Sequence, residues 1–189
     1  MKRQASDLFF PHSGGPASGV GGVRVFAPAG PVPPAPPGHS WESLMGRALE
    51  RARLAAAAGE IPVGAVIAAP DGTVLAEAGN APVGLHDPTA HAEILALRQA
   101  GRVFGNYRLG GCVLVVTLEP CAMCAAACIH ARLAGVVYGA ADSQAGAVVS
   151  RAEYFDAQSA NHSLWHMGGV RGAECAELLR GFFAARREE

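Results

Sequence analysis

The sequence lacks any long apolar run and any strong excess of charge of one sign. No segment approaches the ~18 consecutive apolar residues of a membrane-spanning helix, so a transmembrane protein is not expected. The apolar residues 8–10 are stopped by Pro11, so the chain also lacks the apolar core of a signal peptide, and we expect a soluble, unprocessed protein. The formal net charge of -1 offers no general attraction to nucleic acid; an RNA partner would have to be held by a local arginine cluster.

The sequence also lacks the cysteine pattern of a secreted protein. It has five cysteines, an odd number, and two of them form the Cys121-x-x-Cys124 motif, so a reducing cytoplasm fits better than a disulfide framework. A length of 189 residues favours one domain. Residues 1–39 are dominated by Gly, Pro, Ala and Ser, which predicts a disordered tail, and the folded domain is expected over residues 40–189.

The elements follow from hydrophobic spacing and from turn residues. Apolar residues recur at helical spacing between the N-cap Ser40 and Gly59. The continuous apolar segment 114–118 predicts a central strand buried on both faces, and the strand, helix and strand that start there predict a parallel crossover. The predicted elements are a helix at 40–59, strands at 63–68 and 74–78, a helix from a Thr89 cap to Gly101, a strand at 114–118, a helix at 121–131, a strand at 136–139, a short helix at 152–158, a strand at 164–167 and a helix at 173–187.

Two short clusters carry the chemistry. His91 offers one imidazole, and Cys121 and Cys124 offer two thiols on one face of a helix turn. A zinc ion held by only three protein ligands keeps a fourth position open, which is typical of catalytic sites. Glu93 is two residues from His91 and is expected to carry protons beside this ion. The pattern requires two helix N-termini that point at one metal.

Other interpretations of the two cysteines are a structural zinc site or a redox pair. A structural site needs a fourth protein ligand, and Cys112, Cys128 and Cys175 each fall in an apolar segment that is typical of a core. A catalytic zinc site is therefore favoured. Retention of Glu93 argues in the same direction, because a purely structural site has no use for that carboxylate.

The segments 61–66, 86–94, 106–109 and 116–124 resemble the cytidine and deoxycytidylate deaminase superfamily and, within it, the bacterial tRNA-specific adenosine deaminases. These segments read IPVGAV, HDPTAHAEI, NYRL and VTLEPCAMC. The zinc signature is specific for deamination, and the segments around it resemble the tRNA enzymes more than other members of the superfamily. The resemblance implies a three-layer α/β/α sandwich with a mixed five-stranded sheet, one zinc ion per subunit and a homodimer.

The same resemblance implies hydrolytic deamination of adenosine to inosine at the wobble position of an arginine tRNA, through its anticodon arm, in the cytoplasm. Glu93 matches the residue that acts as both base and acid. Asn80 matches the asparagine that holds the base edge, although a turn residue at a strand end is the plainer interpretation. Asp142 matches a position beside the ribose, where a carboxylate accepting from a 2′-hydroxyl helps to distinguish RNA from DNA. The remaining substrate-binding positions are Val63, Pro82, Val83 and Ala92.

The chain departs from the family pattern near Asp142. Ala141 and Gln144 stand where the family often has basic residues, and Arg151 and Arg180 are alternative phosphate contacts. These departures bear on RNA binding more than on the chemistry. A free nucleobase or nucleotide deaminase, of guanine or cytosine type, shares the zinc signature and remains the second enzyme hypothesis. A catalytically silent zinc-binding subunit is the third.

Overall fold

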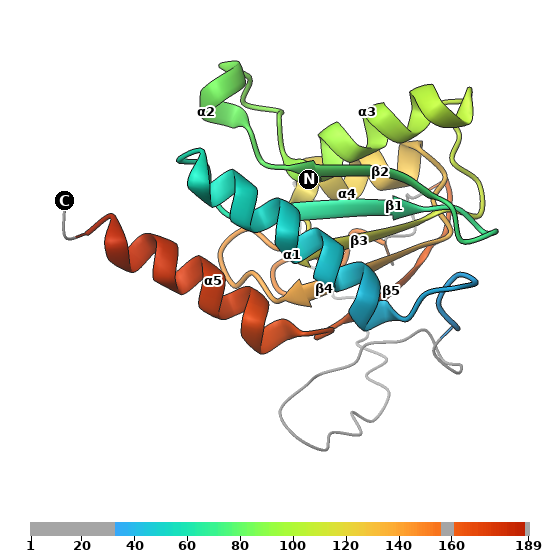
Figure 1. The fold of residues 1–189 in the computed structure, drawn as a ribbon. Coiled ribbons are helices and arrows are strands. Elements are labelled where there is room, and N and C mark those ends of the chain that lie inside the picture. Colours follow the sequence, from blue (N-terminus) through green and yellow to red (C-terminus); the bar gives the residue numbers. More distant parts are fainter. Residues whose placement is uncertain (1–32, 156–160, 188–189) are drawn as a thin grey trace, which may run out of the picture.

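The computed structural model describes residues 33–155 and 161–187. Within these ranges the chain forms one sheet with helices on both faces (Figure 1). No helix in the described ranges is long and apolar enough to cross a membrane. The elements are α1 (Trp41–Ala57), β1 (Gly64–Ala68), β2 (Val74–Gly79), α2 (Pro82–Leu85), α3 (Ala92–Phe104), β3 (Val113–Leu118), α4 (Ala122–His130), β4 (Gly135–Ala140), β5 (Trp165–Gly168) and α5 (Gly172–Ala185).

The five strands lie in the order β2-β1-β3-β4-β5. β1 pairs antiparallel with β2 and β3, whereas β4 pairs parallel with β3 and β5. The sheet is therefore mixed, and the predicted parallel crossover from β3 through α4 to β4 is confirmed. β3 occupies the centre and is almost entirely buried, as its continuous apolar sequence predicts.

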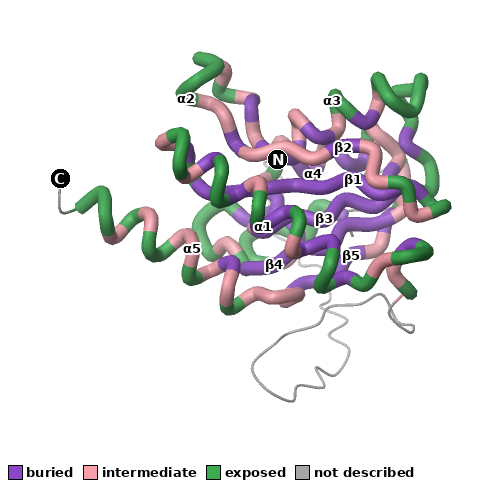
Figure 2. The backbone as a smooth tube through the Cα atoms, viewed as in Figure 1, coloured by how far each residue is buried: buried purple, intermediate pink, exposed green. Residues whose placement is uncertain are grey.

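Helices cover the sheet in two separate layers (Figure 1). One face carries α1 and α5 over a core that includes Leu44, Val115 and Cys175. The opposite face carries α3 and α4 over a core that includes Leu114 and Tyr138. Figure 2 shows β1, β3, β4 and β5 buried along most of their length, whereas β2 at the edge is mostly of intermediate burial. The three-layer α/β/α architecture is thus confirmed.

Close approach of α1 to β1 depends on Gly64. A Cβ atom at this position would lie 2.0 Å from the carbonyl oxygen of Ala48 and 2.6 Å from the backbone nitrogen of Ala52. Only glycine leaves room for the helix backbone at this distance. Gly64 therefore allows the backbone of α1 to pack directly against β1.

Two predicted boundaries of α3 are wrong. The helix begins at Ala92 with His91 as its N-cap, because the Thr89 hydroxyl donates instead to Asp87 Oδ1 at 2.7 Å. Asp87 Oδ1 also accepts from the backbone nitrogen of Thr89 at 2.8 Å, which closes a turn before the helix. The helix passes the predicted stop and ends at Phe104, where Gly105 adopts the left-handed conformation.

Two other predictions meet the limits of the described chain. The short helix predicted at 152–158 is absent over 152–155, and its remaining residues lie outside the described ranges. The tail predicted at 1–39 lies outside them up to residue 32. Residues 33–39 contact the domain: Trp41 Nε1 donates to Pro33 O at 3.1 Å, and His39 Nε2 donates to Gly72 O at 2.9 Å.

Candidate active site

Three ligand atoms converge where α3 and α4 begin. His91 Nδ1 lies 3.7 Å from Cys121 Sγ and 3.6 Å from Cys124 Sγ. The ligand atoms of the three residues lie within 4.8 Å of one another. Zinc bonds to sulfur and nitrogen of about 2.0 to 2.3 Å in a tetrahedron place neighbouring ligand atoms about 3.6 Å apart. The arrangement therefore fits one zinc ion.

The local fold explains why these side chains face the centre. His91 and Cys121 are the N-cap residues of α3 and α4, both with extended backbone. Neither side chain caps its own helix, so each is available to the metal. Cys124 lies three residues after Cys121, on the first turn of α4. The predicted pair of helix N-termini directed at one ion is confirmed in geometry.

Among the described residues, the cluster has three members and no fourth. Cys112, Cys128 and Cys175 are buried and free, and each belongs to the hydrophobic core. A structural zinc site would use a fourth protein ligand. The three-ligand set instead leaves one position for a reacting molecule, as catalytic zinc sites do.

The two thiols are electrostatically unequal. A hydrogen bond from the Cys124 thiol lowers the pKa of Cys121 to about 4, and the neighbouring His91 adds to this effect. The same hydrogen bond and burial raise the pKa of Cys124. The hydrogen bond to Cys121 and the nearby Glu93 charge raise the pKa of His91. One thiolate thus forms readily beside the imidazole, and a bound cation favours the second.

Glu93 lies in the first turn of α3 and is only 4% exposed. Burial raises the pKa of its carboxyl group, while the facing His91 opposes the shift. Its oxygens are not part of the three-ligand cluster. Glu93 is therefore a buried carboxyl group beside the metal position and is not one of the three ligands.

Asn80 joins the end of β2 to the start of α3. Its Oδ1 accepts from the backbone nitrogen of Ala92 at 2.9 Å, and its own backbone nitrogen donates to Val63 O at 2.9 Å. The residue is 9% exposed. The three predicted positions Asn80, Val63 and Ala92 are therefore brought together. Because the Ala92 side chain is fully buried and its amide is engaged, this residue contributes to the frame of the site.

Pro82 and Val83 form the start of α2, and Val83 is 67% exposed. The backbone of this segment is bound by Glu60, a buried carboxylate whose role was not predicted from the sequence. Glu60 Oε1 accepts from Gly84 N at 2.7 Å and Glu60 Oε2 accepts from Val83 N at 3.2 Å. The available signal was an acidic residue directly before the apolar segment 61–68.

Asp142 lies on the loop that follows β4, and this loop reaches the metal cluster through its own backbone. Gly146 forms an isolated bridge with Cys121, and Ala147 N donates to Pro120 O at 2.8 Å. Glu119, the residue before Pro120, accepts the backbone N-H of Asp142 at 3.0 Å. The sequence motif contains Glu119, but its spacing gave no indication of this contact.

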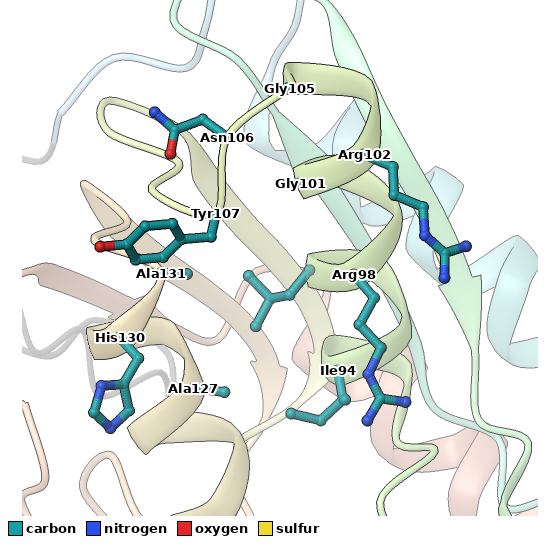
Figure 3. A pocket seen from close by; sticks show the side chains of 11 residues that line it. Ile94, Arg98, Gly101, Arg102, Gly105, Asn106, Tyr107, Ala127, His130 and Ala131 are labelled. Atoms are coloured by element: carbon teal, nitrogen blue, oxygen red, sulfur yellow. The ribbon is translucent and has the colours of Figure 1, made fainter.

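A separate groove of about 760 Å³ runs between α3 and α4 (Figure 3). None of its lining residues belongs to the metal cluster. Tyr107, which is 71% exposed, and His130 stand at its rim. The lining residues are Ile94, Leu97, Arg98, Gly101, Arg102, Gly105, Asn106, Tyr107, Ala127, His130 and Ala131. The groove is a mainly apolar surface beside the site.

Comparison with known proteins matches the chain to a family model and to individual relatives. The model of the cytidine and deoxycytidylate deaminase zinc-binding region matches residues 39–140, more than half of the chain. A tRNA-specific adenosine deaminase of Haemophilus influenzae is 47% identical over 148 residues, which cover 78% of this chain and 86% of the relative.

Two solved structures share the fold. One, from a study of A-to-I editing by tRNA:A34 deaminases at the wobble position, has a TM-score of 0.70 and 44% identity, covering 72% of this chain and 99% of that chain. A guanine deaminase of Nitrosomonas europaea has a TM-score of 0.68 and 27% identity, covering 82% of this chain and 87% of that chain.

Proposed function

The chain belongs to the cytidine and deoxycytidylate deaminase zinc-binding family, and from this premise we propose that it converts adenosine 34 of a transfer RNA into inosine. The observation that carries the reaction type is the convergence of His91, Cys121 and Cys124 with the buried Glu93 beside them. The substrate class is supported by the 47% identity to a tRNA-specific adenosine deaminase over most of both chains.

The reaction replaces the 6-amino group of the purine with oxygen from water and releases ammonia. Zinc bound by the three ligands supplies the Lewis acidity that activates water for attack. We assign two successive proton transfers to Glu93. Its carboxylate takes one proton from the attacking water and passes it to the ring nitrogen. It then takes the remaining proton from the new hydroxyl group on C6 and delivers it to the departing amino group, which leaves as ammonia. A buried carboxyl with a raised pKa suits this alternation.

The base is oriented by the frame around α3. We assign Asn80 to the base edge, because its Oδ1 is fixed by the Ala92 amide and its side-chain amide is thereby held in one orientation. Val63 and the exposed segment of Pro82 and Val83 form the pocket wall in this assignment. Glu60 holds that wall in place through the backbone of α2.

We further propose that the substrate is an arginine tRNA, engaged through its anticodon arm in the cytoplasm. The free state of all five cysteines is consistent with a reducing compartment. Because the net charge is only -1, RNA binding must rely on local arginines. Arg151 and Arg180 are the assigned phosphate contacts, since Ala141 and Gln144 replace basic residues near Asp142.

The likeness to a guanine deaminase favours one second candidate, a free purine deaminase. The decisive experiment compares inosine formation in an arginine anticodon stem-loop with ammonia release from free guanine, adenine and cytosine. The tRNA assignment predicts turnover of the stem-loop and no comparable turnover of the free bases. Turnover of the free bases alone would overturn it.

We also propose a homodimer in which the groove between α3 and α4 is covered by a second copy. Support comes from the apolar lining and from the exposed side chain of Tyr107, which lines the groove. Placing a charge at Tyr107 by Tyr107→Glu should weaken dimerisation at least about tenfold in sedimentation equilibrium.

The matched control for the dimer is Phe183→Glu, which changes a partly exposed aromatic residue on α5, over the opposite face of the sheet. This control should remain dimeric. A wild-type protein that sediments as a monomer at every concentration would contradict the dimer, as would equal effects of the two substitutions.

A further inference from the structure

Glu119 is a buried carboxylate at the end of β3 that the reaction does not use. It is 2% exposed and lies two residues before the ligand Cys121. A buried charge is stable only when hydrogen bonds replace its water. Five donors surround it: Val148 N at 3.1 Å, Val149 N at 2.7 Å and Ser150 N at 2.9 Å on Oε1, and Asp142 N at 3.0 Å together with the Ser150 hydroxyl on Oε2.

All five donors belong to one loop, residues 142–150. The loop wraps the carboxylate so closely that a Cβ atom at Gly146 would lie 2.5 Å from Glu119 Oε2 and 2.5 Å from Asp142 O. The same loop donates from Ala147 N to Pro120 O and bridges Cys121 through Gly146. Glu119 therefore ties this loop to the strand end that delivers a metal ligand.

Asp142 lies at the start of the loop, and its two carboxylate oxygens differ in their hydrogen bonds. Oδ1 accepts from Gln144 N at 2.8 Å and from Ala145 N at 3.1 Å, which fixes the side chain in a turn. Hydrogen bonds from the described residues reach Oδ1 alone, so Oδ2 is the oxygen that remains for a ligand. The backbone N-H of Asp142 is held by Glu119 Oε2.

We propose that Glu119 is a positioning residue for sugar recognition: it fixes the 142–150 loop against Cys121, so that Asp142 Oδ2 meets the 2′-hydroxyl of the nucleotide next to the reacting base. This inference rests on the proposed function and deepens it. Glu119 acts through Asp142, touches no substrate and takes no part in proton transfer. A carboxylate held in this way selects ribose, because deoxyribose offers it no donor.

Glu119→Gln tests the contact with one substituted atom. The glutamine Oε1 can still accept the three N-H groups of residues 148–150, and its Nε2 can donate to the Ser150 hydroxyl. In that orientation the glutamine Nε2-H faces the backbone N-H of Asp142. Two donors cannot form a hydrogen bond, so the contact that positions Asp142 is lost. Ser150→Ala is the matched control, because it removes one donor to the carboxylate and leaves Asp142 N bound.

The readout is KM and kcat for two anticodon stem-loops that differ in one sugar, ribose or 2′-deoxyribose beside the target adenosine. Glu119→Gln should lower the preference for ribose in KM about tenfold, the effect of one hydrogen bond, with kcat and zinc content close to wild type. Ser150→Ala should keep the preference. In an Asp142→Asn background, Glu119→Gln should cause no further loss of ribose preference, because both substitutions remove the same contact with the 2′-hydroxyl group.

Amide hydrogen exchange tests the same contact without RNA. Peptides covering 142–150 should exchange faster in Glu119→Gln than in wild type, while peptides of β3 are unchanged. Gly146→Ala, which pushes a methyl group onto the carboxylate from the loop side, should reproduce the loss of preference.

The outcomes separate the two proposals. A wild-type protein that leaves both stem-loops unmodified contradicts the proposed function. An active wild-type protein with an unchanged sugar preference in Glu119→Gln overturns the role of Glu119 alone. Loss of zinc in this variant, or an equal effect in the Asp142→Asn background, also overturns it, since Glu119 would then act on the metal ligands or on the fold.

Discussion

Glu93 is the residue that separates a catalytic centre from a structural one. It is buried beside the ligands without being one of them. Glu93→Gln should retain zinc, because all three ligands remain. Turnover should fall about 10²- to 10⁴-fold, because the side-chain amide cannot carry protons. Metal analysis together with single-turnover rates measures both effects.

His91→Ala is the matched control for Glu93→Gln. It removes a ligand and should lose both metal and activity. A Glu93→Gln protein that deaminates at a normal rate would contradict the proton-carrier assignment.

The two cysteine ligands could be predicted together because their spacing is local, whereas His91 lies 30 positions before Cys121 and was assigned with them from the ligand types that zinc binds. Cys121 and Cys124 are one helix turn apart, and the preceding Pro120 marks a helix start. The contact of Asn80 with Ala92 and the clamps by Glu60 and Glu119 could not be predicted in this way. In each of them a side-chain oxygen accepts a hydrogen bond from a backbone N-H group, as far as 31 positions along the chain. No period in the sequence records such contacts.

Glu77 on β2 joins this edge strand to α1. Its Oε2 accepts from Arg51 Nη2 at 2.7 Å, and Arg47 donates to Oε1. Burial alone would raise the pKa of Glu77, but the hydrogen bonds and charges of Arg51 and Arg47 outweigh burial and hold the pKa below its ordinary value of 4.5. The contact stabilises the fold above pH 4.5 and is lost as pH falls through the lower folded pKa.

The expected result is that Glu77→Gln lowers the Tm at neutral pH and flattens the decrease in Tm below about pH 4.5. Glu50→Gln is the control, because the Glu50 carboxylate is 64% exposed and its Arg53 partner lies 3.7 Å away. Thermal unfolding between pH 3 and 7 measures the difference. Parallel curves for wild type and Glu77→Gln would show that the ion pair has no role in stability.

Element boundaries were predictable where one signal dominated. Ser40 caps α1 as expected, and the reciprocal hydrogen bonds with Ser43 confirm a capping box. The start of α3 was missed because two cap candidates compete. Thr89 has the better side chain for an N-cap, but Asp87 captures its hydroxyl and leaves the cap position to His91. That shift frees the imidazole for the metal.

At the scale of the whole molecule, the mixed five-stranded sheet was expected from the family resemblance, and the order of its strands was not predicted. Periodicity identified each strand, and the short Asp71-Gly72 turn paired the first two. The placement of β1 between β2 and β3 joins segments far apart in sequence, which local patterns do not encode. The sequence also did not show which helices cover which face of the sheet, because the inner strands are apolar on both sides.

The N-terminal boundary of the domain gives a prediction at this scale. We propose that the domain extends to residue 33, since Pro33 and His39 hydrogen bond to Trp41 and Gly72. Removal of residues 1–32 should leave the Tm and the deamination rate unchanged. Removal of residues 1–39 should lower the Tm, because it deletes both hydrogen bonds and the contact of Ala35 with the core. Equal Tm values for the two truncations would contradict this boundary.

The central claim is that one zinc ion at His91, Cys121 and Cys124 drives deamination of adenosine in an anticodon loop. The most direct measurement is inosine formation in an arginine anticodon stem-loop by the full chain as purified, after metal removal by a chelator, and after zinc is restored. Activity should disappear with the metal and return with one equivalent of zinc per chain. Full activity in the metal-free protein, or a zinc-loaded protein that leaves the stem-loop unchanged, would contradict this claim.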